Sequence, residues 1–281
     1  HEIPPNGQGI AALIALGILE KFDLASLPVD STASQHLQIE AMKLAFADVY
    51  RYVSERSTME VTTEQMLDDA YLASRARLID MRRAQDFQAG NPVKGGTIYL
   101  TAADENGMMV SFIQSNYMGF GSGCVEPHYG ISLQNRGYGF SLDAASPNVV
   151  APGKRPFHTI IPAFLTKDGQ PVMSYGVMGG NMQPQGHMQT LVRMLDYRQG
   201  LQAACDAPRW RFNKGLNINV EAAMNAATVQ GLKDLGHEID VINDSYQDFG
   251  AGQFIWRAGN PAVEGYVAAS DPRRDGLAAG Y

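Results

Sequence analysis

A threonine stands directly behind two glycines at Gly95, Gly96 and Thr97, at the first position of a strand-like run. Because glycine leaves its carbonyl unshielded, the Thr97 hydroxyl can attack the Gly96 carbonyl, and hydrolysis of the resulting ester would free a new N-terminus. The freed threonine would carry its own general base, since an α-amino group titrates at about 8 and a lysine at about 10.4. The pattern predicts a self-cleaving precursor with nucleophile and base on one residue.

A hairpin is expected to bring a second hydroxyl to this threonine. The dipeptide Asn106-Gly107 lies between two strand-like runs and predicts a tight turn. One turn register pairs Ile98 with Ser115 and another pairs Gly96 with Ser115, so either leaves Ser115 within one residue of Thr97. Its hydroxyl could orient the threonine, although a serine that merely ends its strand explains the spacing more simply.

Two more glycines, Gly179 and Gly180, lie between a strand-like run and a helix expected over 185–198. Their N–H groups could form an oxyanion hole aided by the helix N-terminus. A tight turn that needs positive φ explains them as well, and the two interpretations are compatible. Upstream, His158 and Thr159 precede another strand and could line a pocket, although a single histidine is more often structural.

Other kinds of catalytic site are disfavoured. The six histidines show no His-x-x-x-His or His-Glu-x-x-His spacing, so no metal and no organic cofactor is expected. There is no Gly-x-Ser-x-Gly elbow, and the loop 119–123 lacks the Lys-Ser/Thr of a phosphate loop. Cys124 and Cys205 are too few for a disulfide framework, and we interpret them as free thiols, with Cys124 buried and inert.

The composition is that of an ordinary globular protein, with 45% hydrophobic and 18% charged residues among 281. A net charge of −7 argues against binding to nucleic acid or an anionic membrane. The apolar run 10–19 is about half of what a membrane span needs. The chain opens on His1 and reads as the interior of a longer precursor. Free thiols favour the cytoplasm, with a periplasmic or secreted location left open because an upstream signal peptide cannot be judged.

Helices should dominate residues 1–95, and short strands with glycine turns should dominate the rest. Helices are expected at 9–22, 31–54, 62–84, 185–198, 201–205 and 222–235. Strands are expected at 98–103, 108–115, 131–133, 159–165, 172–176, 217–221, 238–241, 252–257 and 263–268. Helices that precede a mixed run of strands and helices indicate layered α and β structure.

A series of short motifs occurs in one order along nearly the whole chain: Pro4-Pro5-Asn6-Gly7-Gln8-Gly9, Gly96-Thr97, Phe120-Gly121-Ser122-Gly123, Lys154-Arg155-Pro156, Gly179-Gly180, Asp206-Ala207-Pro208-Arg209 and Ser270-Asp271-Pro272-Arg273. On these motifs the chain resembles the γ-glutamyltransferase family of N-terminal-nucleophile hydrolases. The resemblance implies an α+β fold, a four-layer αββα sandwich, and a precursor cut between Gly96 and Thr97. Residues 1–96 would be the helical C-terminal part of the large chain, with its upstream half absent, and residues 97–281 the small chain. Together they would be part of one αββα domain.

The resemblance also implies roles for individual residues. Four catalytic positions match: the nucleophile Thr97, its hydroxyl partner Ser115, and the oxyanion pair Gly179 and Gly180. His158 and Thr159 fall where true γ-glutamyltransferases have two serines that grip the substrate carboxylate.

The sequence departs from the transferases at the substrate positions. Tyr117 stands where they place an asparagine, and Arg136 where they place a glutamine. Where they place an aspartate that holds the glutamyl α-amino group, this chain has Gly139 or one of its neighbours Tyr138 and Phe140. Without that carboxylate a glutamyl head would lose its charge partner. These changes resemble the acylase-like and amidohydrolase branch of the family, which includes glutaryl-type cephalosporin acylases and oxamate amidohydrolase.

We therefore expect a self-processing amidohydrolase or acylase that cleaves an amide of a small carboxylate-bearing substrate through an acyl-enzyme, with acyl transfer as a side activity. Arg136, with His158 and Thr159, would hold a carboxylate that has no neighbouring amine, as in oxamate or glutaryl amides. Partners would be this substrate, the protein's own upstream large-chain half and further copies of the processed heterodimer. Two alternatives remain: a true γ-glutamyltransferase or glutathione hydrolase, and a non-catalytic homologue that serves as a binding protein.

Overall fold

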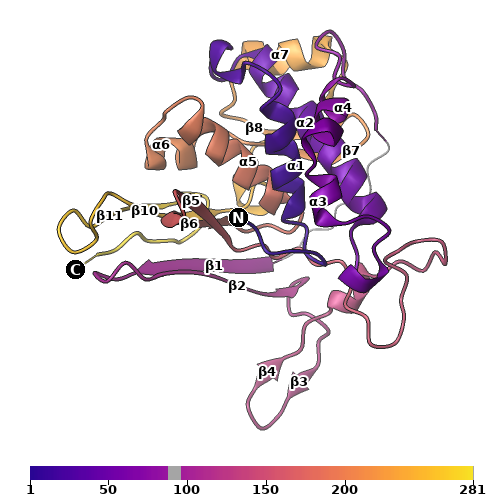
Figure 1. Ribbon diagram of the computed structural model, residues 1–281, viewed down its shortest axis with the longest axis vertical. Coiled ribbons are helices and arrows are strands. Elements are labelled where there is room, and N and C mark those ends of the chain that lie inside the picture. The colour runs from indigo at the N-terminus through magenta and orange to yellow at the C-terminus, as the bar shows by residue number, and fades with distance from the viewer. Residues whose placement is uncertain (88–95, 281) are drawn as a thin grey trace.

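The computed structural model describes residues 1–87 and 96–280, arranged as in Figure 1. Its α-helices are α1 Ile10–Leu19, α2 Thr32–Tyr52, α3 Thr63–Met66, α4 Asp69–Ala76, α5 Met182–Leu195, α6 Leu201–Asp206, α7 Ala226–Asp234 and α8 Ser245–Asp248. Short 3₁₀ turns occur at Leu24–Ser26, Arg56–Thr58 and Arg136–Gly139. Side chains cap several helix starts, as at α2, where Ser31 Oγ accepts from the Ser34 N–H at 3.2 Å.

The strands are β1 Gly96–Ala103, β2 Met109–Tyr117, β3 Val125–Glu126, β4 Ile131–Ser132, β5 Ala163–Lys167, β6 Gln170–Val177, β7 Trp210–Lys214, β8 Asn217–Glu221, β9 Glu238–Ile242, β10 Gly252–Arg257 and β11 Tyr266–Ser270. Strands β11, β10, β6 and β5 form an antiparallel sheet in this order. β1 pairs with β2 and β3 with β4 as hairpins. A three-stranded sheet has the order β7-β8-β9, with β9 parallel to β8.

These elements stack in layers (Figure 1). Helices α5 and α6 cover one face of the four-stranded sheet, and α1 and α2 lie beyond them. The β1–β2 hairpin packs on the opposite face, against β6 and β10. Three of the four layers expected of an αββα sandwich therefore lie within the described residues.

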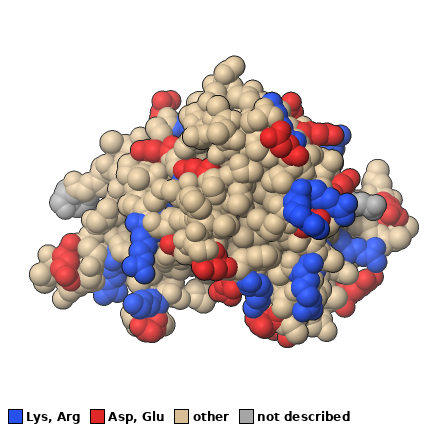
Figure 2. Space-filling model, turned by 90° about the horizontal axis from the view of Figure 1, so that it is seen from above, with Lys and Arg blue, Asp and Glu red and all other residues tan. Residues whose placement is uncertain are grey.

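One hydrophobic core joins the regions on either side of residue 96. Leu37 and Phe46 of α2 pack in the same cluster as Trp210, Phe212 and other residues of the β7–β8 region. The face in Figure 2 carries acidic and basic side chains interspersed around its rim. Within residues 1–87 and 96–280, no helix is both long enough and apolar enough to cross a bilayer.

Several predicted elements differ from the structure. The helix predicted over 62–84 is two helices, because Asp68 caps a second start by accepting from the Tyr71 N–H at 3.0 Å. The strand predicted from residue 159 begins at Ala163, because the Ile161 N–H donates to the Gln183 side chain. The prediction of a buried Cys124 is wrong, since this free thiol is exposed.

The β1–β2 hairpin has a register between the two predicted ones. Ile98 lies opposite Gln114, and Gly96 lies opposite Tyr117, with a bulge between these pairs. The turn spans three residues and ends on Gly107, whose φ of +88° suits glycine. The bulge absorbs one residue directly beside the predicted nucleophile.

Candidate active site

Thr97 lies at the start of β1 with 9% of its surface exposed. Its hydroxyl donates to Ser115 Oγ on β2 at 3.1 Å. The Tyr117 N–H donates to the same Ser115 oxygen at 2.9 Å. The hairpin therefore brings the two hydroxyls together as predicted. Because the Thr97 hydroxyl donates its hydrogen bond to Ser115, the lone pairs of the Thr97 oxygen remain available for attack.

Alternate residues of β1 face β6 and show where Thr97 lies relative to that strand. The Thr101 hydroxyl hydrogen-bonds to the Ser174 hydroxyl. The Tyr99 ring lies so close to Gly176 that a Cβ there would come within 2.5 Å of it. From Thr101 to Tyr99, two residues back along β1, the neighbouring position on β6 moves two residues forward, from Ser174 to Gly176. Thr97 therefore comes level with the end of β6 and the glycine turn that follows it.

That turn contains Gly179 and Gly180, with φ of +122° and +62°, and leads into α5. The neighbouring backbone holds it: the Met178 N–H donates to the Ala251 carbonyl at 2.9 Å, and a Cβ on Gly179 would lie 3.1 Å from the Gly250 Cα. Within the described residues, neither glycine N–H of the turn donates to a protein acceptor. Both groups can therefore bind a developing oxyanion.

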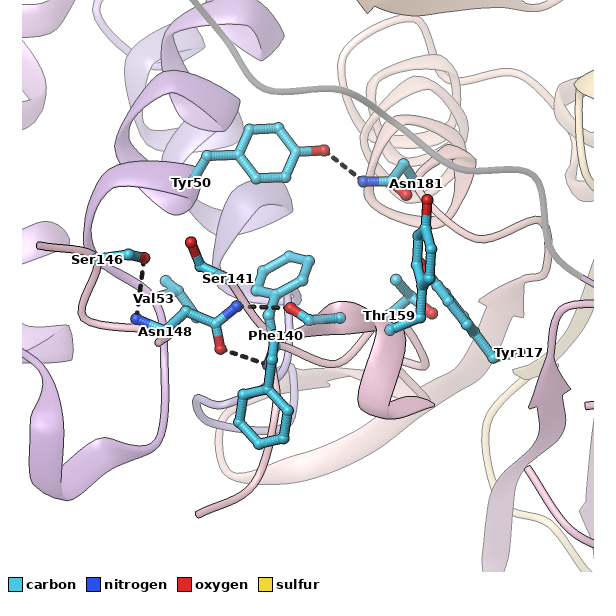
Figure 3. Close-up of a pocket in the computed structure, with 12 residues that line it drawn as sticks. Tyr50, Val53, Tyr117, Phe140, Ser141, Ser146, Asn148, Thr159 and Asn181 are labelled. Atoms are coloured by element: carbon cyan, nitrogen blue, oxygen red, sulfur yellow. Dashed lines mark hydrogen bonds between the residues drawn. The ribbon is translucent and has the colours of Figure 1, made fainter. Parts of the chain in front are cut away.

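A cavity of about 440 Å³ opens beside these elements (Figure 3). Its walls combine aromatic and polar side chains: Tyr50, Val53, Tyr117, Tyr138, Gly139, Phe140, Ser141, Ser146, Asn148, Phe157, Thr159 and Asn181. Tyr117 and Thr159 were predicted to bind substrate, and both line it. Gly139 and its two aromatic neighbours also line it, at the position that lacks the aspartate of the transferases.

Arg136 is a buried cation, 6% exposed, that is not among the residues lining the cavity but contacts two that are, Thr159 and Tyr117. Its Nη1 donates to Thr159 Oγ1 at 3.1 Å, and its guanidinium lies 5.3 Å from the Tyr117 ring centre. Burial lowers the pKa of Arg136 to about 10, so the group stays charged near neutral pH. Among the described residues no carboxylate pairs with Arg136, and Nη2 is buried without a hydrogen-bond partner. Such a group favours binding an anion.

His158 is half-buried and lies within electrostatic range of Arg136. Burial, and then the Arg136 charge, lower the pKa of His158 to about 4, so its imidazole is neutral near neutral pH. Its Nδ1 accepts weakly from the Ile160 N–H at 3.4 Å. Unlike Thr159, it is not among the residues that line the cavity.

Sequence reasoning missed two facing residues of the cavity. The Asn181 side-chain amide donates to the Tyr50 hydroxyl across it (Figure 3). Burial raises the pKa of Tyr50, which therefore stays protonated. Asn181 directly follows the oxyanion turn, whereas Tyr50 comes from α2. A tyrosine at a helical position carries no local sequence signal of such a role.

One group of residues in the described part of the chain has a metal-like set of side chains: His36, Glu40 and His237, all buried. Lys43 lies among them, 2.8 Å from Glu40 Oε1 and 3.4 Å from His237 Nδ1. Its ammonium supplies the positive charge that a cation would bring. His36 Nδ1 and His237 Nε2 share a hydrogen bond of 2.8 Å, and the Asp80 carbonyl lies 3.0 Å from His36 Nε2. We interpret this group as a hydrogen-bonded structural network.

Comparison with known proteins agrees with these features. The family model described as Gamma-glutamyltranspeptidase matches residues 1–281. The chain is 36% identical to a glutathione hydrolase-like YwrD proenzyme of Bacillus subtilis (strain 168), over 100% of this chain and 53% of the relative. It is also 36% identical to an oxamate amidohydrolase proenzyme of Klebsiella pneumoniae, over 99% of this chain and 53% of the relative.

Among solved structures, a cephalosporin acylase from Bacillus halodurans superposes with a TM-score of 0.92 and 48% identity, over 100% of this chain and 50% of that one. A gamma-glutamyltranspeptidase from Pseudomonas nitroreducens superposes with a TM-score of 0.58 over 65% of this chain. These likenesses confirm the predicted fold class. The chain spans about half the length of the relatives that it matches.

Proposed function

This chain belongs to the gamma-glutamyltranspeptidase family, and we propose that it forms part of a self-processing amidohydrolase whose nucleophile is Thr97. The position of Thr97 carries the proposal: a buried strand-start hydroxyl, hydrogen-bonded to Ser115 and level with a turn whose two glycine N–H groups donate to no acceptor among the described residues. Two of the relatives are named as proenzymes, which supports processing of a precursor.

Self-cleavage would begin when Thr97 Oγ1 attacks the carbonyl carbon of Gly96. The C–N bond between the two residues breaks, and the hydroxyl proton passes to the departing nitrogen. Water then hydrolyses the ester and leaves a carboxylate on Gly96 and an α-amino group on Thr97. The free amine, with an ordinary pKa of about 8, becomes the general base of the mature enzyme.

In the mature enzyme the Thr97 oxygen would attack a substrate amide while the amine accepts its proton. The N–H groups of Gly179 and Gly180 would bind the negative oxygen of the tetrahedral intermediate. That intermediate collapses as the leaving amine takes a proton and departs. Water then attacks the acyl-enzyme and releases a carboxylic acid. A second amine in place of water would give acyl transfer.

The substrate would carry a carboxylate and no neighbouring amine. Arg136 is a charged, buried guanidinium without a carboxylate partner among the described residues, and it is fixed by Thr159, which lines the cavity. The pKa of His158 is lowered to about 4, so His158 is neutral near neutral pH and Arg136 is the charged member of this pair. None of Tyr138, Gly139 and Phe140 carries a carboxylate that could hold an α-amino group. Oxamate and glutaryl amides fit this description, and a γ-glutamyl group fits it poorly.

The test compares oxamate, a glutaryl amide and a γ-glutamyl amide as substrates of the full-length precursor, alongside Thr97→Ala. We expect wild-type protein to run as two chains on a denaturing gel and to cleave the first or second substrate. Thr97→Ala should stay uncut and inactive. Efficient γ-glutamyl turnover would favour a true transferase or glutathione hydrolase. An uncut wild-type protein inert toward all three would favour a non-catalytic binding protein.

The upstream half of the precursor would be the partner of this chain. One face of the β1–β2 hairpin is apolar and exposed, with Ile98 71%, Leu100 47%, Val110 43% and Phe112 47% accessible. The opposite face packs on β6 and β10. The relatives continue over about as many residues again, which is enough to cover this face. Further copies of the processed heterodimer, and a cytoplasmic location, remain predictions from the sequence.

A further inference from the structure

The first nine residues run along the segment that carries His158 and Thr159. The His158 N–H donates to the Asn6 carbonyl at 2.9 Å, and the Gln8 N–H donates to the His158 carbonyl at 2.9 Å. Asn6 Nδ2 also donates to the Pro156 carbonyl at 2.5 Å. This backbone pairing places the Gln8 side chain between two parts of the site.

The Gln8 side chain is fully buried and joins these two parts. Its Nε2 donates to the Thr159 carbonyl at 2.7 Å and to the Gly180 carbonyl at 2.8 Å. The two carbonyls fix the orientation of the amide, because a flipped amide would turn its oxygen toward both of them. One side chain thus connects the carboxylate-binding segment with the oxyanion turn.

Two buried glutamines beside the oxyanion turn, Gln8 and Gln183, leave one end of the amide without a hydrogen-bond partner among the described residues, and in this they differ from Gln189. Gln189 both donates to the Trp210 carbonyl at 2.9 Å and accepts from the Trp210 N–H at 3.2 Å, so its amide uses both ends. Gln8 Oε1 is buried without a hydrogen-bond partner among the described residues. A purely stabilising amide would be expected to satisfy both ends, because an unpaired buried acceptor costs about 1–3 kcal/mol.

We infer that Gln8 is a positioning residue that sets the spacing between the carboxylate grip at Thr159 and the oxyanion turn at Gly180, and so selects the length of the acyl group. The inference rests on the proposed function. A substrate held at its carboxylate by Arg136 and Thr159 presents its amide carbonyl at a distance fixed by its carbon chain. An error of about 1 Å in placing that carbonyl can cost about 100-fold in rate.

The contact also crosses the proposed cleavage site. Gln8 would belong to the large chain, whereas Thr159 and Gly180 would belong to the small chain. After cleavage, these two hydrogen bonds would hold the chains together at the site itself. Gln8 would in this way take part in substrate selection although it does not itself line the cavity.

The test measures kcat and KM of the full-length, processed enzyme for oxamate, succinamate and glutaramate, which are monoamides of diacids of increasing length. Gln8→Met keeps the volume and removes both donors, and Gln8→Asn keeps the amide but shortens the side chain. Gln189→Met is the matched control, since it removes a buried amide that has two backbone hydrogen bonds to Trp210 and does not line the cavity.

We expect wild-type enzyme to prefer one chain length. Gln8→Met should lower kcat/KM for that substrate by about 10-fold to 100-fold and reduce the preference, with Gln8→Asn intermediate. Gln189→Met should leave the order of substrates unchanged. An unchanged preference in both Gln8 variants, or an equal loss of preference in Gln189→Met, would overturn the inference about Gln8 and leave the proposed function standing. A wild-type enzyme inert toward all three monoamides would refute the proposed function as well.

Discussion

Substituting Arg136 by methionine should remove a substrate contact at little cost to folding. Arg136 is only 6% exposed and donates a hydrogen bond to Thr159 Oγ1. It pairs with no carboxylate among the described residues. Removing it therefore leaves no buried acid without its partner. We expect the free energy of unfolding to change by less than about 1 kcal/mol, far less than when a buried ion pair is broken.

The effect on catalysis should be large for a charged substrate. Truncating one member of a buried, hydrogen-bonded charge pair costs about 2–5 kcal/mol. Arg136 offers one unpaired nitrogen and shares the other with Thr159, so we take about 3 kcal/mol, or about 150-fold in kcat/KM. Arg136→Lys should recover part of this loss, because it restores the charge without the planar fork.

The assay uses the carboxylate-bearing amide that the wild-type enzyme cleaves best and the methyl ester of the same compound. Arg136→Met should lower kcat/KM for the carboxylate and leave the value for the uncharged ester nearly unchanged. Arg193→Met is the matched control, because Arg193 is a buried arginine that pairs with Asp30. It should lower the melting temperature without changing the ratio between the substrates. Equal losses on both substrates in Arg136→Met would refute the carboxylate-binding role.

Three further outcomes are expected. Ser115→Ala should slow self-cleavage about 100-fold by removing the oxygen that accepts a hydrogen bond from the Thr97 hydroxyl and orients it, and Ser115→Thr should retain the rate, as followed by gel densitometry. The pKa of His158 is lowered to about 4 from its ordinary 6.5, so the unfolded chain binds more protons between these values. Stability should therefore fall as the pH falls from 6.5 to 4, and His158→Gln should reduce that fall in melting temperature. Gly250→Ala would place a Cβ 2.1 Å from the Met178 carbonyl oxygen at a φ of +67°, so it should displace the oxyanion turn and lower kcat more than it raises KM.

Features that depend on neighbours in sequence were predictable. Hairpin spacing alone brought Ser115 to Thr97, and the register differed from prediction only through one bulge. Glycines between a strand and a helix indicated the turn at Gly179 and Gly180, because few other residues adopt its positive φ. The family resemblance, confirmed by the comparisons, added the fold class, whereas the division into a large and a small chain stays a prediction.

Features that depend on distant contacts were not predictable from the pattern. Strand β7 was missed because Arg211 is buried beside Trp210 and Phe212 and pairs with Asp248, which removes the alternation of polar and apolar residues. The roles of Tyr50 and Gln8 depend on partners more than 130 residues away. Only the folded chain brings these groups to the cavity.

The most direct test of the central claim is the N-terminal sequence of the small chain in catalytically active material, obtained from the full-length precursor. We predict that this chain begins at Thr97 and that Thr97→Ala yields only uncut, inactive precursor. Active protein in which the bond between Gly96 and Thr97 is still intact would contradict the account, because its threonine would have no free amine to accept the proton.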